Sequence, residues 1–469
     1  MSSLEQGVNQ EVYYGILPMM PKERIYDFKA TVLIIGGYAI ATWCYVQGGY
    51  IGTMLPLKAL FSSTVFSMTL VGLLVCLVGI IPQRHGIDMW LYQRAIFGYS
   101  LIGIIWLIVI ASTWGYEAVN ARLFANSIMT VLQELGIPAE GPVWVGVLGT
   151  ACIVIGGVIA VKGPVAIKIS TYIMVPCLLA VGVLIVVLIF RNASWADLMA
   201  VNPAESLGGD DFRTNYMVVL EWNIAFIFAW YPGFAVLPRL VKTEKSYYWG
   251  FLLGFCTIMA CFVLIGAMTG LLTYAKTGVA STDPTDWLIG LGGPVLGLLS
   301  LVFIGFANIT TQALACYTIG MSTKTMLPRR SYKSIVVFWS IFCIVLVFWD
   351  GIWQYYNTYI AIVGAVSGPA IMLLIVDYFI VRKGKFSLTG VYRLNGDCRY
   401  RYTKGFNIPA LVSFAIGVTV YFVVYDPVAA WPRSDLFLYT TASGFSAICT
   451  TASYYIMSKI PAVRKYMQV

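Results

Sequence analysis

The sequence has very little of what soluble enzymes and metalloproteins need. Only 11% of its 469 residues are charged, and it holds a single histidine, His85. It contains no HExxH motif, no phosphate-binding loop motif and no nucleophile–histidine arrangement. The ten cysteines show no CxxC or CxxxC spacing, so neither a disulfide framework nor a metal site is indicated. These absences argue against an enzyme, including an integral-membrane enzyme.

The sequence is rich in apolar residues. They make up 59% of the chain and give a mean hydropathy of +0.81, which is typical of a polytopic membrane protein. We predict an all-α fold with about twelve transmembrane helices. Their approximate bounds are 29–57, 61–82, 97–131, 144–163, 168–190, 214–238, 248–274, 294–322, 333–350, 354–382, 406–425 and 434–458.

Basic and acidic residues alternate between the loops that connect these spans. With the N-terminus inside, the cytoplasmic loops carry basic clusters such as Arg329-Arg330, and the opposite loops carry acids such as Glu134. This is the positive-inside pattern, so the net charge of +9 is a topology signal and not a nucleic-acid footprint. We expect a multi-pass protein of the plasma or inner membrane, with segments 1–28 and 459–469 in the cytoplasm.

Two predicted spans contain residues that interrupt a helix. The first holds Gln47 and the pair Gly48-Gly49, and the sixth holds Pro232-Gly233. The two breaks lie five spans apart, which is the sequence pattern of an inverted-repeat transporter with its binding sites at the bilayer midplane. The alternative is a pair of kinks filled by packed neighbours.

The predicted eighth span carries two adjacent hydroxyl residues. Ala307, Thr310 and Thr311 fall at positions i, i+3 and i+4 and share one helix face. Two hydroxyls and a nearby carbonyl oxygen suit a small, hard cation such as Na⁺, which prefers oxygen ligands. The alternative is that both hydroxyls bond to carbonyl groups of their own helix.

Two glutamates lie inside predicted spans. Glu117 is in the third span, three residues after Trp114, and Glu221 is in the outer half of the sixth. A carboxylate in hydrocarbon costs roughly 2.5–3.5 kcal/mol, so each is expected to face a cavity or a partner. The alternatives are an ion pair of Glu117 with Arg122 and an interfacial position for Glu221. Protonation of either acid would couple transport to H⁺.

Five stretches of the sequence resemble the motifs of one known protein family, and they occur in the same order along the chain. They are 39–44 with the glycine pair that follows, 94–98, 230–232 with Arg239, Gly368-Pro369 with 377–384, and 402–411. Because they follow one another over most of the chain, the protein resembles the nucleobase–cation symporter family, the group of cytosine, hydantoin and allantoin permeases.

The resemblance implies a LeuT-type five-plus-five inverted repeat that works by alternating access. The first repeat would occupy 29–190 and the second 214–382, with two additional C-terminal helices in 406–458. It also implies that Na⁺ is held by backbone carbonyls and hydroxyls of Trp43, Val46, Ala307, Thr310 and Thr311.

Substrate-contacting residues follow from the resemblance and from the intramembrane acids. They are Gln47, Trp114, Glu117, Ala118, Glu221, Phe228, Ala229, Trp230, Gln312 and Cys316. Three positions depart from the family pattern: Val236 replaces a frequent aspartate, Cys316 a frequent asparagine, and Glu117 a neutral or amide residue. An acid in the pocket favours an amine, an amidinium or a cationic heterocycle.

The sequence therefore predicts a secondary transporter that symports a small nitrogen heterocycle with Na⁺. We expect no organic cofactor, no nucleic-acid partner and no obligatory protein partner. The alternative is an H⁺-coupled symporter of the same substrate class that uses Glu117 or Glu221. A channel is a further alternative, although bulky tryptophan and phenylalanine side chains around the breaks favour an occluded pocket.

Overall fold

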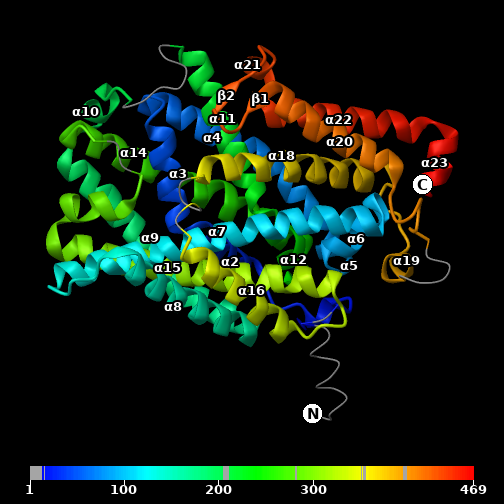
Figure 1. The fold of residues 1–469 in the computed structure, drawn as a ribbon, viewed down its shortest axis with the longest axis horizontal. Coiled ribbons are helices and arrows are strands. Elements are labelled where there is room, and N and C mark those ends of the chain that lie inside the picture. Colours follow the sequence, from blue (N-terminus) through cyan, green and yellow to red (C-terminus); the bar gives the residue numbers. More distant parts are fainter. Residues whose placement is uncertain are drawn as a thin grey trace, which may run out of the picture.

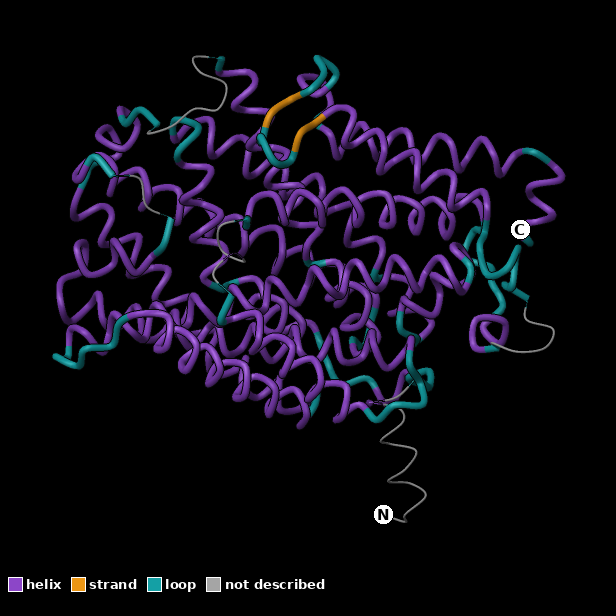
Figure 2. Tube along the Cα trace, viewed as in Figure 1, coloured by secondary structure: helices purple, strands orange, loops and turns teal. Residues whose placement is uncertain are grey.

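The computed structural model describes residues 13–14, 16–203, 211–279, 282–349, 351, 355–393 and 399–469. Over these residues the chain is mostly helical, and its longest helices lie side by side (Figures 1 and 2). Two short strands, β1 (Tyr425–Asp426) and β2 (Trp431–Pro432), form an antiparallel hairpin. The predicted all-α architecture is confirmed.

The helices follow one another with short connections. In the first half they are η1 (Pro21–Glu23), α2 (Phe28–Ala39), α3 (Thr42–Gly52), α4 (Leu57–Val78), α5 (Ile80–His85), α6 (Met89–Phe97), α7 (Tyr99–Glu134), α8 (Gly141–Lys162), α9 (Pro164–Asn192) and α10 (Trp195–Ala200). In the second half they are α11 (Phe212–Ala229), α12 (Tyr231–Val236), η2 (Leu237–Leu240), α13 (Glu244–Phe251), η3 (Leu252–Ile258), α14 (Met259–Thr277), α15 (Pro284–Met326), α16 (Tyr332–Val347), α18 (Tyr356–Ile375), η4 (Val376–Val381), α19 (Leu388–Tyr392), α20 (Ile408–Val424), α21 (Phe437–Thr440), α22 (Ala442–Lys459) and α23 (Pro461–Met467).

Every predicted span overlaps a helix or a helix pair. By length and composition, seven of the described helices are able to cross a membrane, or up to nine if each bent pair counts as one span. Two shorter apolar helices, α16 and α20, have 16 and 17 residues. The count of twelve and the division at 29–190, 214–382 and 406–458 stay predictions. Of the two predicted tails, 1–28 lies partly outside the described residues and 459–469 contains α23.

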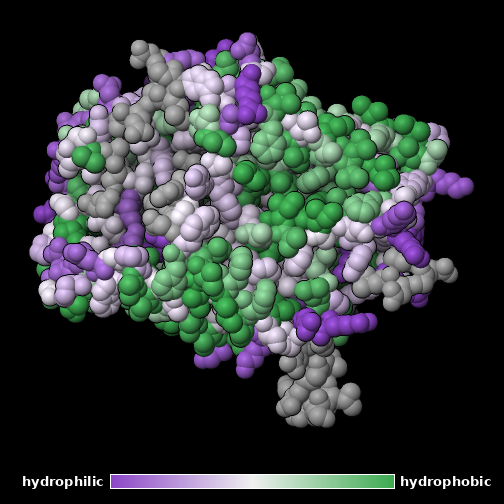
Figure 3. All heavy atoms as spheres, in the orientation of Figure 1, coloured by the Kyte–Doolittle hydropathy of each residue, from purple (hydrophilic) through white to green (hydrophobic). Residues whose placement is uncertain are grey.

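The outside of the bundle is apolar along the middle of its helices. Figure 3 shows broad hydrophobic areas there and hydrophilic atoms gathered toward the ends. On α16, for example, Val337, Phe338, Ile341 and Val345 are all exposed. A surface of this kind is suited to contact with lipid chains and not with water.

The first and sixth spans are both broken, as predicted. α2 and α3 meet at an angle of 54°, and α11 and the segment 231–240 meet at 42°. Pro232 stands in the first turn of α12, where its missing N–H removes no helical hydrogen bond. The sequence therefore located the break of the sixth span to within a few residues.

The predicted position of the first break is wrong. The chain leaves the helix at Ile40 and Ala41, before the polar and glycine residues that suggested the break. Thr42, the first residue of α3, donates its backbone N–H and its hydroxyl to Asn308 Oδ1 at 3.3 and 2.9 Å. This side chain of α15 thus accepts a hydrogen bond from the first backbone N–H of α3, which has no partner within its own helix.

The glycine pair of the first span serves close packing instead. Gly48 and Gly49 are helical residues of α3, and α3 packs closely against α14. A Cβ atom on Gly48 would lie 2.1 Å from the carbonyl oxygen of Val263, and one on Gly49 would lie 2.7 Å from Cα of Thr282. The absence of side chains lets two helix backbones approach each other, which is a common use of glycine in membrane helices.

We expect Gly48→Ala to destabilise the protein by about 1–3 kcal/mol or more, because the added methyl group must displace the backbone of α14. Gly290→Ala is a matched control, since a Cβ atom added at this position of α15 would have nothing within 4 Å. That change is expected to be neutral or to stabilise by roughly 0.4–1 kcal/mol. Thermal unfolding in detergent measures both variants, and equal melting temperatures would contradict the packing role of Gly48.

One end of the bundle is held together by a buried ion pair. Arg382 Nε donates to Asp377 Oδ2 at 2.8 Å, and both side chains are at most 1% exposed. Tyr92 and Tyr454 donate to the same carboxylate at 2.8 and 2.7 Å. Arg382 Nη2 donates to backbone carbonyls of α6 and α23. This network connects the entry to α7, the end of the tenth span and the C-terminal helices.

Candidate functional site: a closed cavity at the two helix breaks

A small cavity lies where the two broken spans meet α7. It is lined by Tyr38, Trp43, Thr113, Tyr116, Glu117, Ala229 and Trp230. Its volume is about 20 Å³, which holds one water molecule and not a heterocycle. The cavity is therefore closed in this conformation, and a ligand with a ring would require the surrounding helices to move.

Aromatic side chains form most of the cavity wall. The rings of Tyr38 and Trp230 meet edge to face at 4.5 Å, and those of Trp43 and Tyr116 do so at 5.2 Å. Trp230 Nε1 is buried and has no hydrogen-bond partner among the described residues. An apolar wall with a free buried donor is suited to a flat ligand that carries a hydrogen-bond acceptor.

Glu117 is the acidic member of the cavity wall, and its carboxylate reaches Gln312 on α15. One terminal atom of the Gln312 amide lies 2.8 Å from Glu117 Oε2 and 3.0 Å from Asn120 Nδ2. As a nitrogen, this atom donates to an ionised Glu117; as an oxygen, it accepts from Asn120 and from a protonated Glu117. The orientation of the amide is therefore tied to the charge of Glu117. Arg122, which the sequence offered as an ion-pair partner for Glu117, donates to the backbone carbonyl of Val347.

The hydroxyl pair of the eighth span lies beside the break of the first. α15 is interrupted at Gly293, so that its long second part begins at Pro294. Thr310 donates its hydroxyl to the carbonyl of Ala307 at 2.8 Å, within its own helix. Thr311 instead points across to α2, and its hydroxyl lies 3.5 Å from the carbonyl oxygen of Gly37. Hydroxyl and carbonyl oxygens are the kinds of ligand that a hard cation such as Na⁺ prefers.

The carbonyl groups expected from the first span are placed differently. Trp43 and Val46 lie inside α3, beyond the break, where carbonyl oxygens take part in the helical hydrogen-bond ladder. The carbonyl that Thr311 approaches belongs to Gly37, near the C-terminal end of α2, where the last carbonyls of a helix lack helical partners. The difference follows from the shifted position of the break.

Four expected substrate contacts lie away from the cavity. The Trp114 ring stacks on Trp339 of α16, with centroids 5.3 Å apart, and Ala118 is fully buried on α7. Gln47 donates to Asn223 Oδ1 of α11 at 3.2 Å. Cys316 lies one turn beyond Gln312, with its sulfur 3.9 Å from the amide nitrogen of that side chain. Of these residues, Cys316 touches the network behind Glu117, and none lines the cavity.

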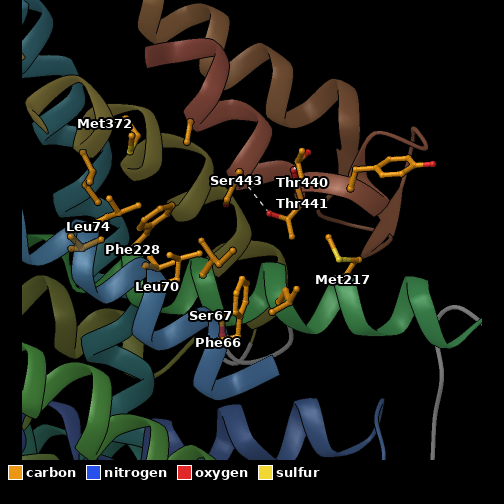
Figure 4. A pocket seen from close by; sticks show the side chains of 18 residues that line it. Phe66, Ser67, Leu70, Leu74, Met217, Phe228, Met372, Thr440, Thr441 and Ser443 are labelled. Carbon is orange, nitrogen blue, oxygen red and sulfur yellow. Dashed lines mark hydrogen bonds between the residues drawn. The ribbon is translucent and has the colours of Figure 1, made fainter. Parts of the chain in front are cut away.

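Two further expected contacts lie at or beside a different hollow. Phe228 lines an apolar groove of about 360 Å³ between α4, α11, α18 and α22 (Figure 4). Glu221 is fully buried beside this groove, where it accepts hydrogen bonds from the backbone N–H and the hydroxyl of Ser443 at 2.8 and 2.6 Å. Glu221 therefore caps the first turn of α22, a helix outside the two predicted repeats. Ala229 and Trp230, which follow Phe228, do line the cavity as expected.

The sequence reasoning missed three lining residues. Thr113 and Tyr116 share the α7 face of Glu117 at positions i, i+3 and i+4, a spacing that could have identified them. Tyr38 precedes the true break of the first span, and the shifted position of that break hid it. Trp43 was expected to act through its carbonyl group, and its ring lines the cavity instead.

Comparison with solved structures defines the class of protein. A nucleobase-cation-symport-1 family transporter, solved in a closed conformation with bromovinylhydantoin bound, is 20% identical, covers 96% of this chain and 98% of its own, and superposes with a TM-score of 0.76. A Na⁺-coupled sialic acid symporter is 13% identical, covers 95% and 92%, and superposes with a TM-score of 0.63. The chain thus has the LeuT-type inverted-repeat fold of membrane transporters, as the sequence predicted.

Comparison of sequences defines the family. The family model for permeases of cytosine/purines, uracil, thiamine and allantoin matches residues 20–460. A hydantoin permease of Microbacterium maritypicum is 25% identical over 73% of this chain and 70% of its own length. A purine-uracil permease of Arabidopsis thaliana is 23% identical over 71% of this chain, which spans about half (52%) of that relative. The chain belongs to this nucleobase–cation symporter family, and it is an integral membrane transporter and not an enzyme.

Proposed function

We propose that the protein carries a small, flat nitrogen heterocycle across the plasma or inner membrane together with Na⁺, by alternating access. The observation that carries this proposal is the meeting of three features at one place. The Thr311 hydroxyl approaches the Gly37 carbonyl, this contact lies beside the break of the first span, and the aromatic cavity lies at that same break. The relatives named for hydantoin and for purine and uracil support a ring-shaped substrate.

The cavity chemistry favours a substrate with a hydrogen-bond acceptor and a basic group. Trp230 supplies an indole N–H and aromatic faces suited to stacking. Glu117 supplies a carboxylate with no ion pair among the described residues. A nucleobase, hydantoin or vitamin precursor with an amine or amidinium group would satisfy both. Binding of Na⁺ beside the break would favour one arrangement of α2 relative to α15. Through this preference the Na⁺ gradient would bias the binding of substrate.

Uptake into proteoliposomes tests the proposal. We expect an inward Na⁺ gradient to drive accumulation of a labelled heterocycle and an inward H⁺ gradient at equal Na⁺ to drive none. Candidate substrates come from a thermal-shift screen of purified protein with and without Na⁺, because a ligand that binds the folded state raises its melting temperature. Accumulation driven by the H⁺ gradient alone would contradict Na⁺ coupling.

A second candidate, H⁺-coupled symport, is favoured by the contact between Glu117 and Gln312. The amide has two orientations that match the two charge states of the carboxyl group, so a proton on Glu117 would change the hydrogen bonds of α7 with α15. Glu117→Gln removes the titrating group and keeps its shape. Under Na⁺ coupling, this variant should keep Na⁺-driven uptake and lose affinity for basic substrates; under H⁺ coupling, it should exchange substrate without accumulating it.

A further inference from the structure

A strongly basic surface lies at the end of the bundle that holds the Arg382 network. Five exposed cations form it, and we call it the basic loop surface: Lys383, Lys385, Arg399, Arg401 and Lys404. They border two hollows of about 330 and 400 Å³ that share the side chain of Tyr400. Neither hollow has an aspartate or glutamate among its described lining residues, although the terminal residue Val469 lines the second, and none of the five cations forms an ion pair with another described residue.

The backbone that presents these cations is held in a fixed shape. The Ser100 N–H at the start of α7 donates to the Gly405 carbonyl at 2.8 Å, and its hydroxyl donates to the Lys404 carbonyl at 3.1 Å. The hydroxyl of Tyr402 donates to the Ala95 carbonyl at 2.6 Å. The backbone around Arg401 and Lys404 is therefore held against the entry to α7.

Part of this backbone is also strained. Lys383, Tyr402 and Lys404 have φ angles of 50°, 46° and 53°, three of the six non-glycine residues with positive φ in the described chain. Such conformations cost free energy for residues with a Cβ atom, and they persist where the surrounding structure holds them. Two of the three, Lys383 and Lys404, are members of the basic loop surface.

The surface lies at the boundary between polar and lipid-facing parts of the molecule. The helices that rise from it, α7 and α20, carry exposed apolar side chains within their first turns, including Ile104 on α7 and Ile408 and Val412 on α20. Figure 3 shows hydrophilic atoms at this end, near the C-terminus, next to hydrophobic surface. A molecule bound here would meet cations at one end and apolar helix faces at the other.

We propose that the basic loop surface binds the phosphate group of an anionic phospholipid, with the acyl chains lying along α7 and α20. Arginine donates two parallel hydrogen bonds to phosphate oxygens, lysine adds a mobile point charge, and basic pockets at the membrane edge are suited to such headgroups. The lipid would hold the loop against the entry to α7. Because this loop also packs against the Arg382 network, the lipid would stabilise the whole end of the bundle.

Thermal unfolding in mixed micelles tests the proposal without reference to transport. Dioleoyl phosphatidylglycerol should raise the melting temperature on the order of 3 °C above the value in dioleoyl phosphatidylcholine. Arg401→Gln/Lys404→Gln should lose most of that difference. Lys242→Gln/Lys245→Gln removes the same charge from the exposed start of α13 and the residues before it, and should keep the difference. The charge-preserving variant Arg401→Lys/Lys404→Arg should also keep it, which separates a loss of charge from a loss of folding.

Three results would overturn the proposal. The first is an equal melting temperature of the unmodified protein in the two lipids, and the second is an equal lipid effect in the two charge-removing variants. The third is an increase produced by inorganic phosphate in phosphatidylcholine micelles that matches the phosphatidylglycerol effect and disappears in Arg401→Gln/Lys404→Gln, because the ligand would then be a soluble phosphate compound. Phosphatidylglycerol dependence without a phosphate effect supports the lipid.

Discussion

Thr311→Ala is expected to raise the Na⁺ concentration needed for half-maximal uptake by about 10- to 100-fold, the loss that removal of a group supporting a metal ion commonly causes. The Thr311 hydroxyl is the one that leaves its own helix and approaches the Gly37 carbonyl of α2. Its removal takes away the oxygen through which the eighth span approaches the α2 half of the broken first span. Uptake of labelled substrate at increasing Na⁺, with choline replacing Na⁺ at constant ionic strength, measures the change.

A threonine that bonds only within its helix is the matched control. The Thr269 hydroxyl donates to carbonyl groups of α14 at 3.0 and 2.9 Å and is fully buried. Thr269→Ala should leave the Na⁺ dependence unchanged. Thr310→Ala should fall between the two, since its hydroxyl neighbours that of Thr311 but bonds within α15, to the carbonyl of Ala307. If all three variants show the Na⁺ dependence of the unmodified protein, the hydroxyl pair serves packing alone.

Asp377→Asn should destabilise the protein by about 3–5 kcal/mol, because it leaves the Arg382 guanidinium buried without its counter-charge. The asparagine amide would also present a donor to hydroxyls that now donate, those of Tyr92 and Tyr454. Thermal or denaturant unfolding in detergent, followed by tryptophan fluorescence, measures the loss. The effect is expected even in the absence of substrate and Na⁺, since the network lies at the end of the bundle.

An exposed ion pair of the same chain gives the control. Asp426 accepts from Arg433 at 2.6 Å, but their side chains are 26% and 51% exposed. Asp426→Asn should therefore cost only about 0–1 kcal/mol. The double variant Asp377→Asn/Arg382→Met should be more stable than Asp377→Asn, because it removes the unpaired charge as well. A double variant that is less stable than the single one would contradict this account.

The sequence predicted the spans well and the contacts between them poorly. Long apolar runs identify helices because a bilayer requires them, and the Pro232 break was predicted correctly because proline cannot continue the helical ladder. Glycine is ambiguous: the pair at Gly48 was interpreted as a break and instead permits close packing. The true break at Ile40 and Ala41 has no unusual composition.

The two acidic residues show why site residues are harder to predict than spans. Both glutamates are buried, and the cost of placing charge in hydrocarbon predicted a cavity or a partner for each. The partner of Glu221 is Ser443, on a helix 222 residues away in sequence, and no local pattern points to it. Glu117 does line the cavity, with Thr113 and Tyr116 beside it on one helix face. Local spacing around Glu117 would have been enough to find the α7 wall, whereas long-range pairing required the structure.

The Asn308 cap on Thr42 determines which side of the first break is able to bend. It ties the first turn of α3 to α15, so bending at Ile40 and Ala41 that preserves the cap displaces α2 relative to both helices. Such a displacement changes the distance between the Gly37 carbonyl and the Thr311 hydroxyl, now 3.5 Å. A change in the angle between α2 and α3 is therefore accompanied by a change in the distance between these two oxygen atoms. A cation that fixes this distance would also fix the angle.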